Sequence, residues 1–203
     1  PVGTTAEGWQ VLLGSTGEVV GTDGRVVTWS LEMEPDLGVA MTEFAPEVVA
    51  ADAVVLPGAG AFRDAMARLR DSGLDDAIRE VLQRGRPYLG LCLGLQVLFD
   101  ESDEHGRTPG FGVLPGRVER FPDRDAAGDR LRVPQIGWNE VRFEGNHPML
   151  AGFPERDYFY FVHSYDMVPN APGATLAETE YGLRFTSVVR RQNVWGVQFH
   201  PEK

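Results

Sequence analysis

The only cysteine of the chain lies in the segment Pro87-Tyr88-Leu89-Gly90-Leu91-Cys92-Leu93-Gly94-Leu95-Gln96, an apolar run with a glycine on each side of the sulfur. This pattern predicts a strand that ends in a sharp turn at Cys92 and continues directly into a helix, as in the nucleophile elbow of hydrolases. A thiol at the start of a helix faces the positive end of the helix dipole, which favours the thiolate. Most free cysteines are small buried hydrophobes, so the segment alone leaves nucleophile and core residue equally open.

Strands and helices alternate around this segment. Residues 53–56 read as a buried strand, stopped by Pro57-Gly58-Ala59-Gly60. Apolar positions three or four residues apart predict one helix through Phe62, Met66 and Leu69 and a second from Leu74 to Gly85. A further helix after Cys92 would carry Gln96 and Phe99. Alternation of this kind predicts a parallel sheet covered by helices.

The second half of the chain is rich in strands. These are expected at residues 138–143, 158–165, 176–180, 186–190 and 194–200, after a charged loop at 123–130. We therefore expect one α/β domain over residues 1–203, with a mostly parallel, flavodoxin-like sheet flanked by helices and a strand-rich second half. Residues 1–46 are atypical, since they show no opening strand and helix, and the C-terminus is expected to be truncated.

Composition excludes several classes of function. The chain has 203 residues, 42% of them hydrophobic, and a formal net charge of −11. That charge argues against nucleic-acid binding, which needs cationic side chains, and no apolar run is long enough to cross a membrane. A single cysteine fits a reducing compartment, and we expect the cytoplasm. The dispersed histidines give no metal-ligand spacing, so no metal site is expected.

A second candidate for chemistry closes the last strand. His200 ends the strand at 194–200, Pro201 stops it, and Glu202 follows two positions after the histidine. A carboxylate at that spacing can hold one imidazole nitrogen while the other faces a partner, which fixes the tautomer of a general base. Taken alone, an ordinary histidine at a strand end beside a solvated glutamate is the more common case.

The two candidates support each other because parallel strands deliver functional residues at their carboxyl ends. Cys92 follows one strand and His200 closes another, so both can meet at one edge of the sheet. A cysteine, a histidine and an orienting acid suffice for acyl transfer through a thioester. The turn at Pro57–Gly60 follows a strand at the same edge, where its backbone N–H groups and that of Leu93 could hold an oxyanion. Without this context, that turn is equally well explained as a tight loop.

Several segments resemble one family. Gly90-x-Cys92-x-Gly94-x-Gln96 and His200-Pro201-Glu202 are similar to the motifs of the Cys-His-Glu class I glutamine amidotransferases. Four further segments narrow the resemblance to the glutaminase subunits of imidazole glycerol phosphate synthases: residues 56–62, 109–116, 136–141 and 160–165. The resemblance covers roughly residues 48 to 203.

The resemblance implies a specific reaction. Such subunits release ammonia from L-glutamine and pass it to a (β/α)₈-barrel cyclase, forming a heterodimer that makes imidazole glycerol phosphate and an aminoimidazole carboxamide ribotide in histidine biosynthesis. No cofactor is implied. The catalytic residues would be Cys92, His200 and Glu202, and the oxyanion hole Ala59, Gly60 and Leu93. The substrate would contact Gln96, Glu104, His163, Ser164 and Tyr165, and the cyclase would face Trp138, Asn139 and Lys203.

The chain also departs from the family pattern. We find no opening strand with an Asp-Tyr-Gly-like turn and no final helix, and Gln135 stands where a histidine is more usual. A fragment, a divergent paralogue or a disturbed N-terminal sequence would each explain these departures. For the function, two alternatives remain open. One is a glutaminase that serves another synthase, and the other is an inactive pseudo-enzyme that only binds a partner. His163, which is flanked by aromatic residues, could also be a core or loop histidine.

Overall fold

The computed structural model describes residues 45–144, 150, 154–201 and 203, together with four short N-terminal strands. These strands are β1 (Gly3–Thr4), β2 (Gln10–Val11), β3 (Thr16–Val20) and β4 (Val26–Ser30), each paired antiparallel with the next. Most of the first 46 residues, the region that the sequence marks as atypical, lie outside the described residues. The residues that carry the candidate site lie almost entirely inside them.

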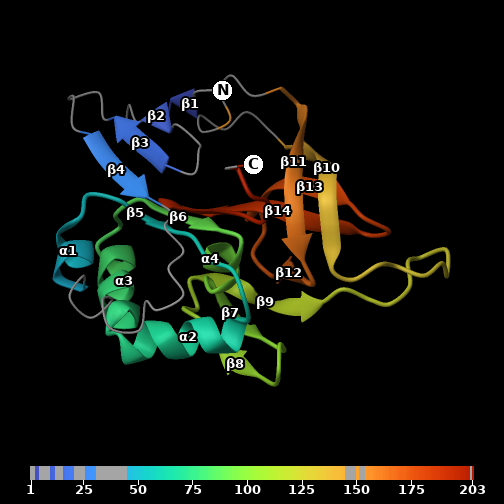
Figure 1. Cartoon of the computed structure of the whole chain (residues 1–203), viewed down its shortest axis with the longest axis horizontal. Helices are drawn as coiled ribbons and strands as arrows, with labels where there is room; N and C mark the ends of the chain where they lie inside the picture. Colours follow the sequence, from blue (N-terminus) through green and yellow to red (C-terminus); the bar gives the residue numbers. More distant parts are fainter. Residues whose placement is uncertain are drawn as a thin grey trace.

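A seven-stranded sheet forms the centre of the described fold, in the order β11-β10-β13-β14-β15-β6-β5 (Figure 1). Its strands are β5 (Val54–Leu56), β6 (Tyr88–Leu91), β10 (Gln135–Phe143), β11 (Arg156–His163), β13 (Thr175–Glu180), β14 (Arg184–Arg191) and β15 (Val194–Val197). The expected α/β class is confirmed, but the expectation of a mostly parallel sheet is wrong for the described strands. Within this sheet, only β5–β6 and β6–β15 pair in parallel. The strands β13, β14 and β15 follow one another through short connections, which return the chain antiparallel.

Two helices form at the predicted periodic positions, residues 62–71 and 74–83, whereas the helix at residues 45–50 was not predicted. The helices are α1 (Ala45–Ala50), α2 (Phe62–Asp71), α3 (Leu74–Gln83) and α4 (Leu93–Gln96), and Figure 1 shows α1, α2 and α3 gathered on one side of β5 and β6. The helix α2 buries Phe62, Met66 and Leu69, the residues that the spacing selected. No helix in the described part of the chain is long and apolar enough to span a membrane.

The helix after Cys92 is shorter than expected, and the prediction that it reaches Phe99 is wrong. The strand β7 (Phe99–Ser102) begins there and joins β8 (Thr108–Pro109), β9 (Leu114–Arg120) and β12 (Tyr165–Pro169) in a second sheet. The carbonyls that would continue the helix accept bonds from a distant loop, because Phe111 N–H donates to Val97 O at 2.7 Å and Val113 N–H to Leu98 O at 2.9 Å. Tertiary pairing thus ends the helix after a single turn.

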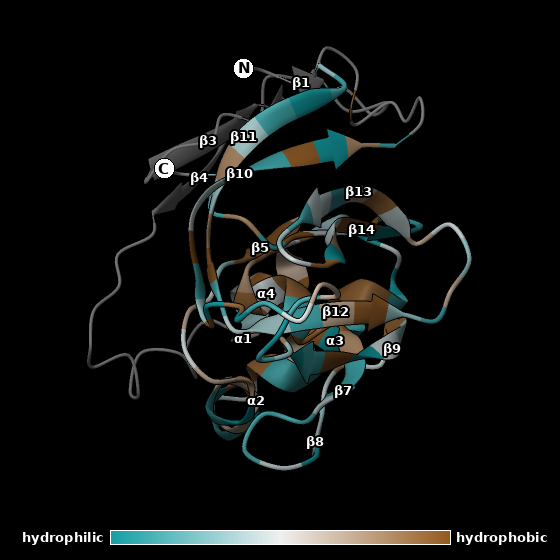
Figure 2. Cartoon of the chain, turned by 90° about the vertical axis from the view of Figure 1, so that its right-hand side faces the viewer, coloured by the Kyte–Doolittle hydropathy of each residue, from teal (hydrophilic) through white to brown (hydrophobic). Residues whose placement is uncertain are grey.

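Two hydrophobic clusters stabilise these sheets. The larger surrounds α4 and joins it to α2, α3 and β7, with Phe62, Met66, Leu95 and Phe99 fully buried. The smaller lies between the inner face of the β10–β11 hairpin and β14, around Phe121, Phe161 and Phe185. Figure 2 shows the hydrophobic residues concentrated at α4 and the strands around it.

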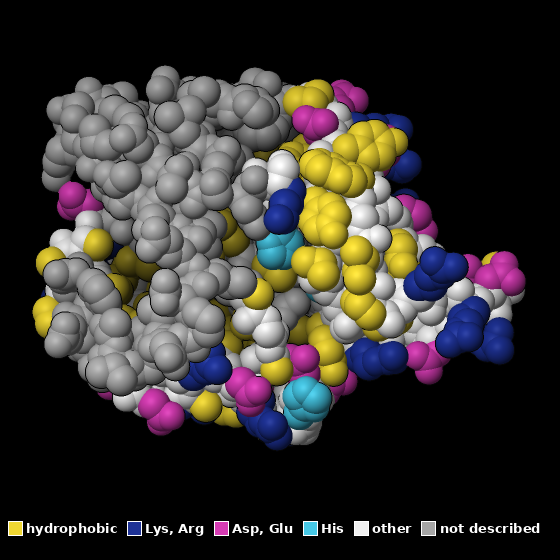
Figure 3. All heavy atoms as spheres, viewed as in Figure 1, with side chains coloured by type: hydrophobic (Ala, Val, Ile, Leu, Met, Phe, Trp, Pro, Cys, Tyr) yellow, Lys and Arg dark blue, Asp and Glu magenta, His cyan; other side chains and the backbone are white. Residues whose placement is uncertain are grey.

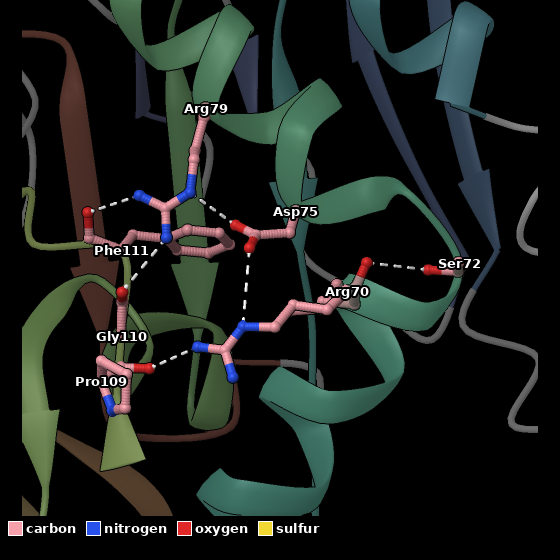
Figure 4. A network of polar contacts seen from close by, with 8 residues as sticks. Arg70, Ser72, Asp75, Arg79, Pro109, Gly110 and Phe111 are labelled. Atoms are coloured by element: carbon pink, nitrogen blue, oxygen red, sulfur yellow. Dashed lines mark hydrogen bonds and ion pairs between the residues drawn. The ribbon is translucent and has the colours of Figure 1, made fainter.

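A polar network braces the helical side of the first cluster (Figure 4). Asp75 pairs with Arg79 at 2.7 Å and with Arg70 at 3.7 Å. Arg79 donates to the carbonyls of Phe111 and Gly110, at 3.0 and 3.2 Å, and its guanidinium lies 5.1 Å from the centre of the Phe111 ring. These bonds fix α2 and α3 against the loop that ends α4.

Candidate active site

Cys92 occupies a strained turn between β6 and α4, as the glycine pattern predicts. Its backbone has φ 52° and ψ −107°, a region that costs a non-glycine residue on the order of 1–3 kcal/mol. The glycines permit the close approach that this turn requires. A Cβ on Gly90 would lie 2.3 Å from the Gly94 carbonyl oxygen, and one on Gly94 would lie 1.8 Å from that of Leu56. Because α4 has only four residues, its dipole is smaller than the sequence argument assumed.

The Cys92 sulfur accepts a hydrogen bond from a side chain that sequence reasoning missed. Gln198 Nε2 donates to Sγ at 3.4 Å, and Gln198 Oε1 accepts from Gln96 Nε2 at 2.9 Å. Both glutamines are buried, Gln198 completely. An N–H donor toward sulfur is an interaction that favours the thiolate form. The one signal for Gln198 in the sequence is a polar residue inside an otherwise apolar terminal strand.

His200 lies at the same edge of the sheet as Cys92. The strand β15 runs parallel to β6, with Val197 opposite Leu91, and Cys92 N–H donates to Val197 O at 2.8 Å. Beyond β15, His200 N–H donates to Tyr160 O at 2.8 Å, which fixes the end of the chain against β11. The expected meeting of the two strand ends is confirmed. Glu202 lies outside the described residues.

The turn expected to hold an oxyanion comes directly after β5. Leu93 N–H donates to the Gly58 carbonyl oxygen at 3.4 Å, so this N–H is directed at the turn itself. Ala59 and Gly60 are exposed, and Gly60 has φ 104°, which suits glycine alone among common residues. The turn and the nucleophile are therefore adjacent, with the Gly58 carbonyl between them.

The residues expected to contact glutamine lie on three segments, of which α4 carries Gln96. Glu104 follows β7, and its Oε2 accepts a hydrogen bond from Phe62 N–H at 2.5 Å. Tyr165 begins β12 and is half-buried, and the pKa of its phenol is raised, first by desolvation and then by the negative charges of Glu104 and Asp103. Ser164 lies just before it, where its carbonyl accepts from Phe121 N–H at 3.0 Å.

His163 faces the core rather than an open site. Its Nδ1–H donates to the Tyr165 carbonyl at 2.7 Å, and its ring lies 5.1 Å from that of Phe121 and 5.3 Å from that of Phe185. Burial lowers the pKa of His163 to about 4, so the ring is neutral at pH 7. This placement matches the alternative of a core histidine.

The β10–β11 hairpin carries hydrophobic side chains on its outer face. Ile136 is 62% exposed, Trp138 56%, Tyr158 61% and Val162 40%. The register places Ile136 opposite Val162 and Trp138 opposite Tyr160, so these side chains share one face. Figure 3 shows hydrophobic side chains gathered over this hairpin. We call Ile136, Trp138, Tyr158, Tyr160 and Val162 the outer hairpin face.

Of the other two residues expected at an interface, Asn139 lies on the opposite face of the hairpin, and Lys203 follows shortly after His200. Asn139 has the opposite parity to Trp138 along β10, and its Oδ1 accepts from Gln135 Nε2 at 2.8 Å. Lys203 is exposed, and its N–H donates to His200 O at 3.3 Å. Among the described residues, no three His, Cys, Asp or Glu side chains group as metal ligands.

A model of the glutamine amidotransferase class-I family matches residues 27–203. The chain belongs to this family. The imidazole glycerol phosphate synthase subunit HisH of Geobacillus thermodenitrificans is 52% identical over 150 residues, which cover 74% of this chain and 70% of that protein. The subunit of the same name from Moorella thermoacetica is 50% identical over 165 residues, 81% of this chain and 76% of that protein.

Solved structures show the same fold for this amidotransferase. A crystal structure of a glutamine amidotransferase superposes with a TM-score of 0.58 at 24% identity, over 78% of this chain and 75% of that one. The glutaminase domain of Trypanosoma brucei CTPS with bound acivicin gives a TM-score of 0.52 at 18% identity, over 79% and 67%. At these identities, the likeness concerns the fold alone.

Proposed function

We propose that this amidotransferase is the glutaminase subunit of an imidazole glycerol phosphate synthase in histidine biosynthesis, and that it works in the cytoplasm. Relatives that carry that subunit name are about half identical to it over 74% and 81% of its length. The observation that carries the chemistry is Cys92, held in a strained elbow next to the strand that leads to His200. Residues 1–203 act as one glutaminase domain.

We assign one role in the reaction to each of these groups. The Cys92 thiolate attacks the side-chain carboxamide carbon of L-glutamine, and His200 protonates the nitrogen that leaves as ammonia. The thioester is then hydrolysed by a water molecule whose proton goes to His200, releasing glutamate and the thiolate. Glu202 orients His200. Gln198 holds the sulfur in place and is itself fixed by Gln96.

Stabilisation of the oxyanion requires a movement of the turn after β5. Leu93 N–H is directed at the Gly58 carbonyl in this structure and has to be released before it can serve a developing oxyanion. The Gly58 carbonyl and the Ala59 N–H belong to one planar peptide unit, so turning the carbonyl away directs that N–H to the side where Leu93 N–H lies. We expect low activity for the isolated subunit and higher activity when a partner favours the turned peptide.

The outer hairpin face is the surface that meets the cyclase partner. Exposed aromatic and aliphatic side chains on one face are typical of the core of a protein interface. The backbone bond from His200 to Tyr160 joins this hairpin to the catalytic edge, so docking there acts close to the reacting groups. Ammonia released at Cys92 would then enter the partner without crossing bulk water.

The test replaces the nucleophile in the assembled complex. The Cys92→Ala variant should lose glutamate release by several orders of magnitude, while synthesis supported by added ammonium salt continues because the cyclase site is intact. A thiol-reactive glutamine analogue should label the wild type at Cys92 and leave the variant unlabelled. Unchanged glutamate release in the variant would contradict the proposal. Labelling without transfer of ammonia to this cyclase would instead favour service to another synthase.

A further inference from the structure

The Glu104 carboxylate connects the segment after β7 to the turn that carries the expected oxyanion donors. Glu104 follows β7, and its Oε2 accepts the N–H of Phe62 at 2.5 Å across 42 residues of sequence. Phe62 opens α2 and comes two positions after Gly60, at the downstream end of the turn that carries the expected oxyanion donors. A carboxylate at a helix N-terminus satisfies an N–H that has no partner within the helix.

Nothing in the turn itself provides this bond. The residue before the helix is Ala61, which makes no side-chain hydrogen bond as a cap. The Phe62 side chain is completely buried, so the first turn of α2 cannot move without disturbing the core. Glu104 therefore supplies from a distance an acceptor for the first N–H of the helix, whereas a local Ser, Thr or Asp cap accepts from the second or third.

The upstream end of the turn is fixed by the nucleophile segment. Gly94 packs against the Leu56 carbonyl so closely that an added Cβ would lie 1.8 Å from it, and the Gly58 carbonyl accepts from Leu93 N–H. The five residues from Pro57 to Ala61 are thus held by the elbow at one end and by Glu104 at the other. Because the Gly58–Ala59 peptide has to reorient between these two fixed ends, its orientation depends on the contacts at both of them.

Glu104 also lies near the segment expected to hold glutamine. Its charge contributes to the raised pKa of the Tyr165 phenol, behind desolvation. The backbone N–H of Glu104 donates to Ser102 Oγ at 3.1 Å. Because the Ser102 side chain is buried at the end of β7, this bond fixes the backbone from which the Glu104 side chain extends. A carboxylate has two oxygens, and the bond to Phe62 uses one of them.

We propose that Glu104 is a positioning residue for the oxyanion donors, because its bond to Phe62 N–H fixes the downstream end of the turn in which the Gly58–Ala59 peptide reorients. This inference rests on the proposed glutaminase function and adds a role in the chemical step to the expected contact between Glu104 and the substrate. The negative charge of Glu104 contributes to glutamine binding, while the Glu104 oxygen that accepts from Phe62 N–H fixes the turn. Two substitutions separate these roles.

Glu104→Gln keeps an acceptor oxygen at the same reach but removes the charge. Glu104→Asp keeps the charge but is one methylene shorter, so it no longer reaches Phe62 N–H. In the complex with the cyclase, we expect Glu104→Gln to raise KM for glutamine about tenfold or more with kcat within about threefold of wild type. We expect Glu104→Asp to lower kcat about 10- to 100-fold, in the range for weakening one oxyanion donor.

Asp103→Asn is the matched control, since it removes the neighbouring carboxylate, and its kinetics should match wild type.

A second readout separates positioning from general damage. Alkylation of Cys92 by iodoacetamide needs no oxyanion donors, so its rate in Glu104→Asp should equal that of wild type if the elbow is intact. Wild-type kcat in Glu104→Asp, or a fall in kcat matched by an equal fall in alkylation, would overturn the positioning role. A wild-type complex that releases no glutamate would instead overturn the proposed function, and this inference with it.

Discussion

The elbow at Cys92 and the β10–β11 hairpin use apolar residues in opposite ways. Around the elbow, the backbone segments pack so closely that glycines at 90 and 94 leave no room for a Cβ. The hairpin buries only its inner face and leaves Trp138 56% and Tyr158 61% exposed on the outer one. In the first region, side chains and backbone stabilise the fold, whereas in the second a row of apolar side chains contributes little to it.

The difference separates two kinds of functional constraint. A nucleophile has to be held in one geometry, which dense packing and a strained backbone provide. A docking surface has to remain available, so its apolar side chains stay in solvent until the partner covers them. Substitutions at the elbow should therefore change the free energy of unfolding, and substitutions on the outer hairpin face should change binding to the cyclase. The contacts of each residue predict how large each change is.

The largest effect is expected at the elbow. In Gly94→Ala, the added Cβ meets the Leu56 carbonyl oxygen at 1.8 Å, and because that oxygen belongs to the backbone, the sheet or the turn has to shift. We expect a loss of more than about 4 kcal/mol in the free energy of unfolding, enough to prevent folding of a domain of ordinary stability. Urea denaturation followed by circular dichroism measures it.

The control for this substitution is Gly106→Ala. Gly106 has φ 98° and open space around its Cβ position, so only backbone strain opposes the change. Its cost should be about 1–2 kcal/mol. Equal costs at the two glycines would show that the elbow is no more tightly packed than a surface turn.

A smaller effect, on a different measurement, is expected at the hairpin. Trp138→Ala should weaken binding to the cyclase by about 30- to 100-fold, the range of a central aromatic residue in an interface, measured by isothermal titration calorimetry. Its free energy of unfolding should change by less than about 0.5 kcal/mol, because the side chain is mostly in solvent.

Phe161→Leu is the matched control on the inner face of the same hairpin. Phe161 is fully buried, so this change should cost about 1–2 kcal/mol of stability and leave binding close to wild type. The opposite result, with Trp138→Ala destabilising the fold and leaving binding intact, would remove the distinction between the two faces.

The smallest effect concerns pH. Burial lowers the pKa of His163 to about 4, below its usual value near 6.5. The unfolded chain therefore takes up a proton first as the pH falls, so the stability that neutral His163 contributes is present above pH 6.5 and is lost toward pH 4. Between pH 7 and pH 5, His163 alone should account for a loss of about 1–2 kcal/mol.

His163→Asn should remove this part of the pH dependence while its amide still donates to the Tyr165 carbonyl. The control variant is Val162→His, which places a histidine next to position 163 but on the outer hairpin face. Because position 162 is 40% exposed in the native protein, a histidine there should titrate near its ordinary pKa and add no pH dependence. Denaturation curves from pH 5 to 8 compare the three proteins, and equal slopes in wild type and His163→Asn would contradict the prediction.

The regions also differ in how well their sequences predict them. The helices α2 and α3 and the strands β5 and β6 were predicted closely, because each carries its own local pattern of apolar positions. The length of α4 and the sheet that contains β7 were not, because the carbonyls after α4 are bonded to residues 111–114, a pairing that no local pattern records. The antiparallel pairing of β10 with β11 and with β13 was missed for the same reason, whereas the hairpin of β14 and β15 follows from the turn residues at 191–193.

The sequence by itself determined the nucleophile turn, the two strand ends that carry Cys92 and His200, and the family. These depend on glycine positions, strand alternation and motif spacing, all of which are local. Tertiary structure alone placed Gln198 on the Cys92 sulfur, the Gly58 carbonyl on Leu93 N–H and the Glu104 carboxylate on Phe62 N–H. Each of those contacts joins residues 35 or more positions apart. Such contacts form only once the whole core has packed.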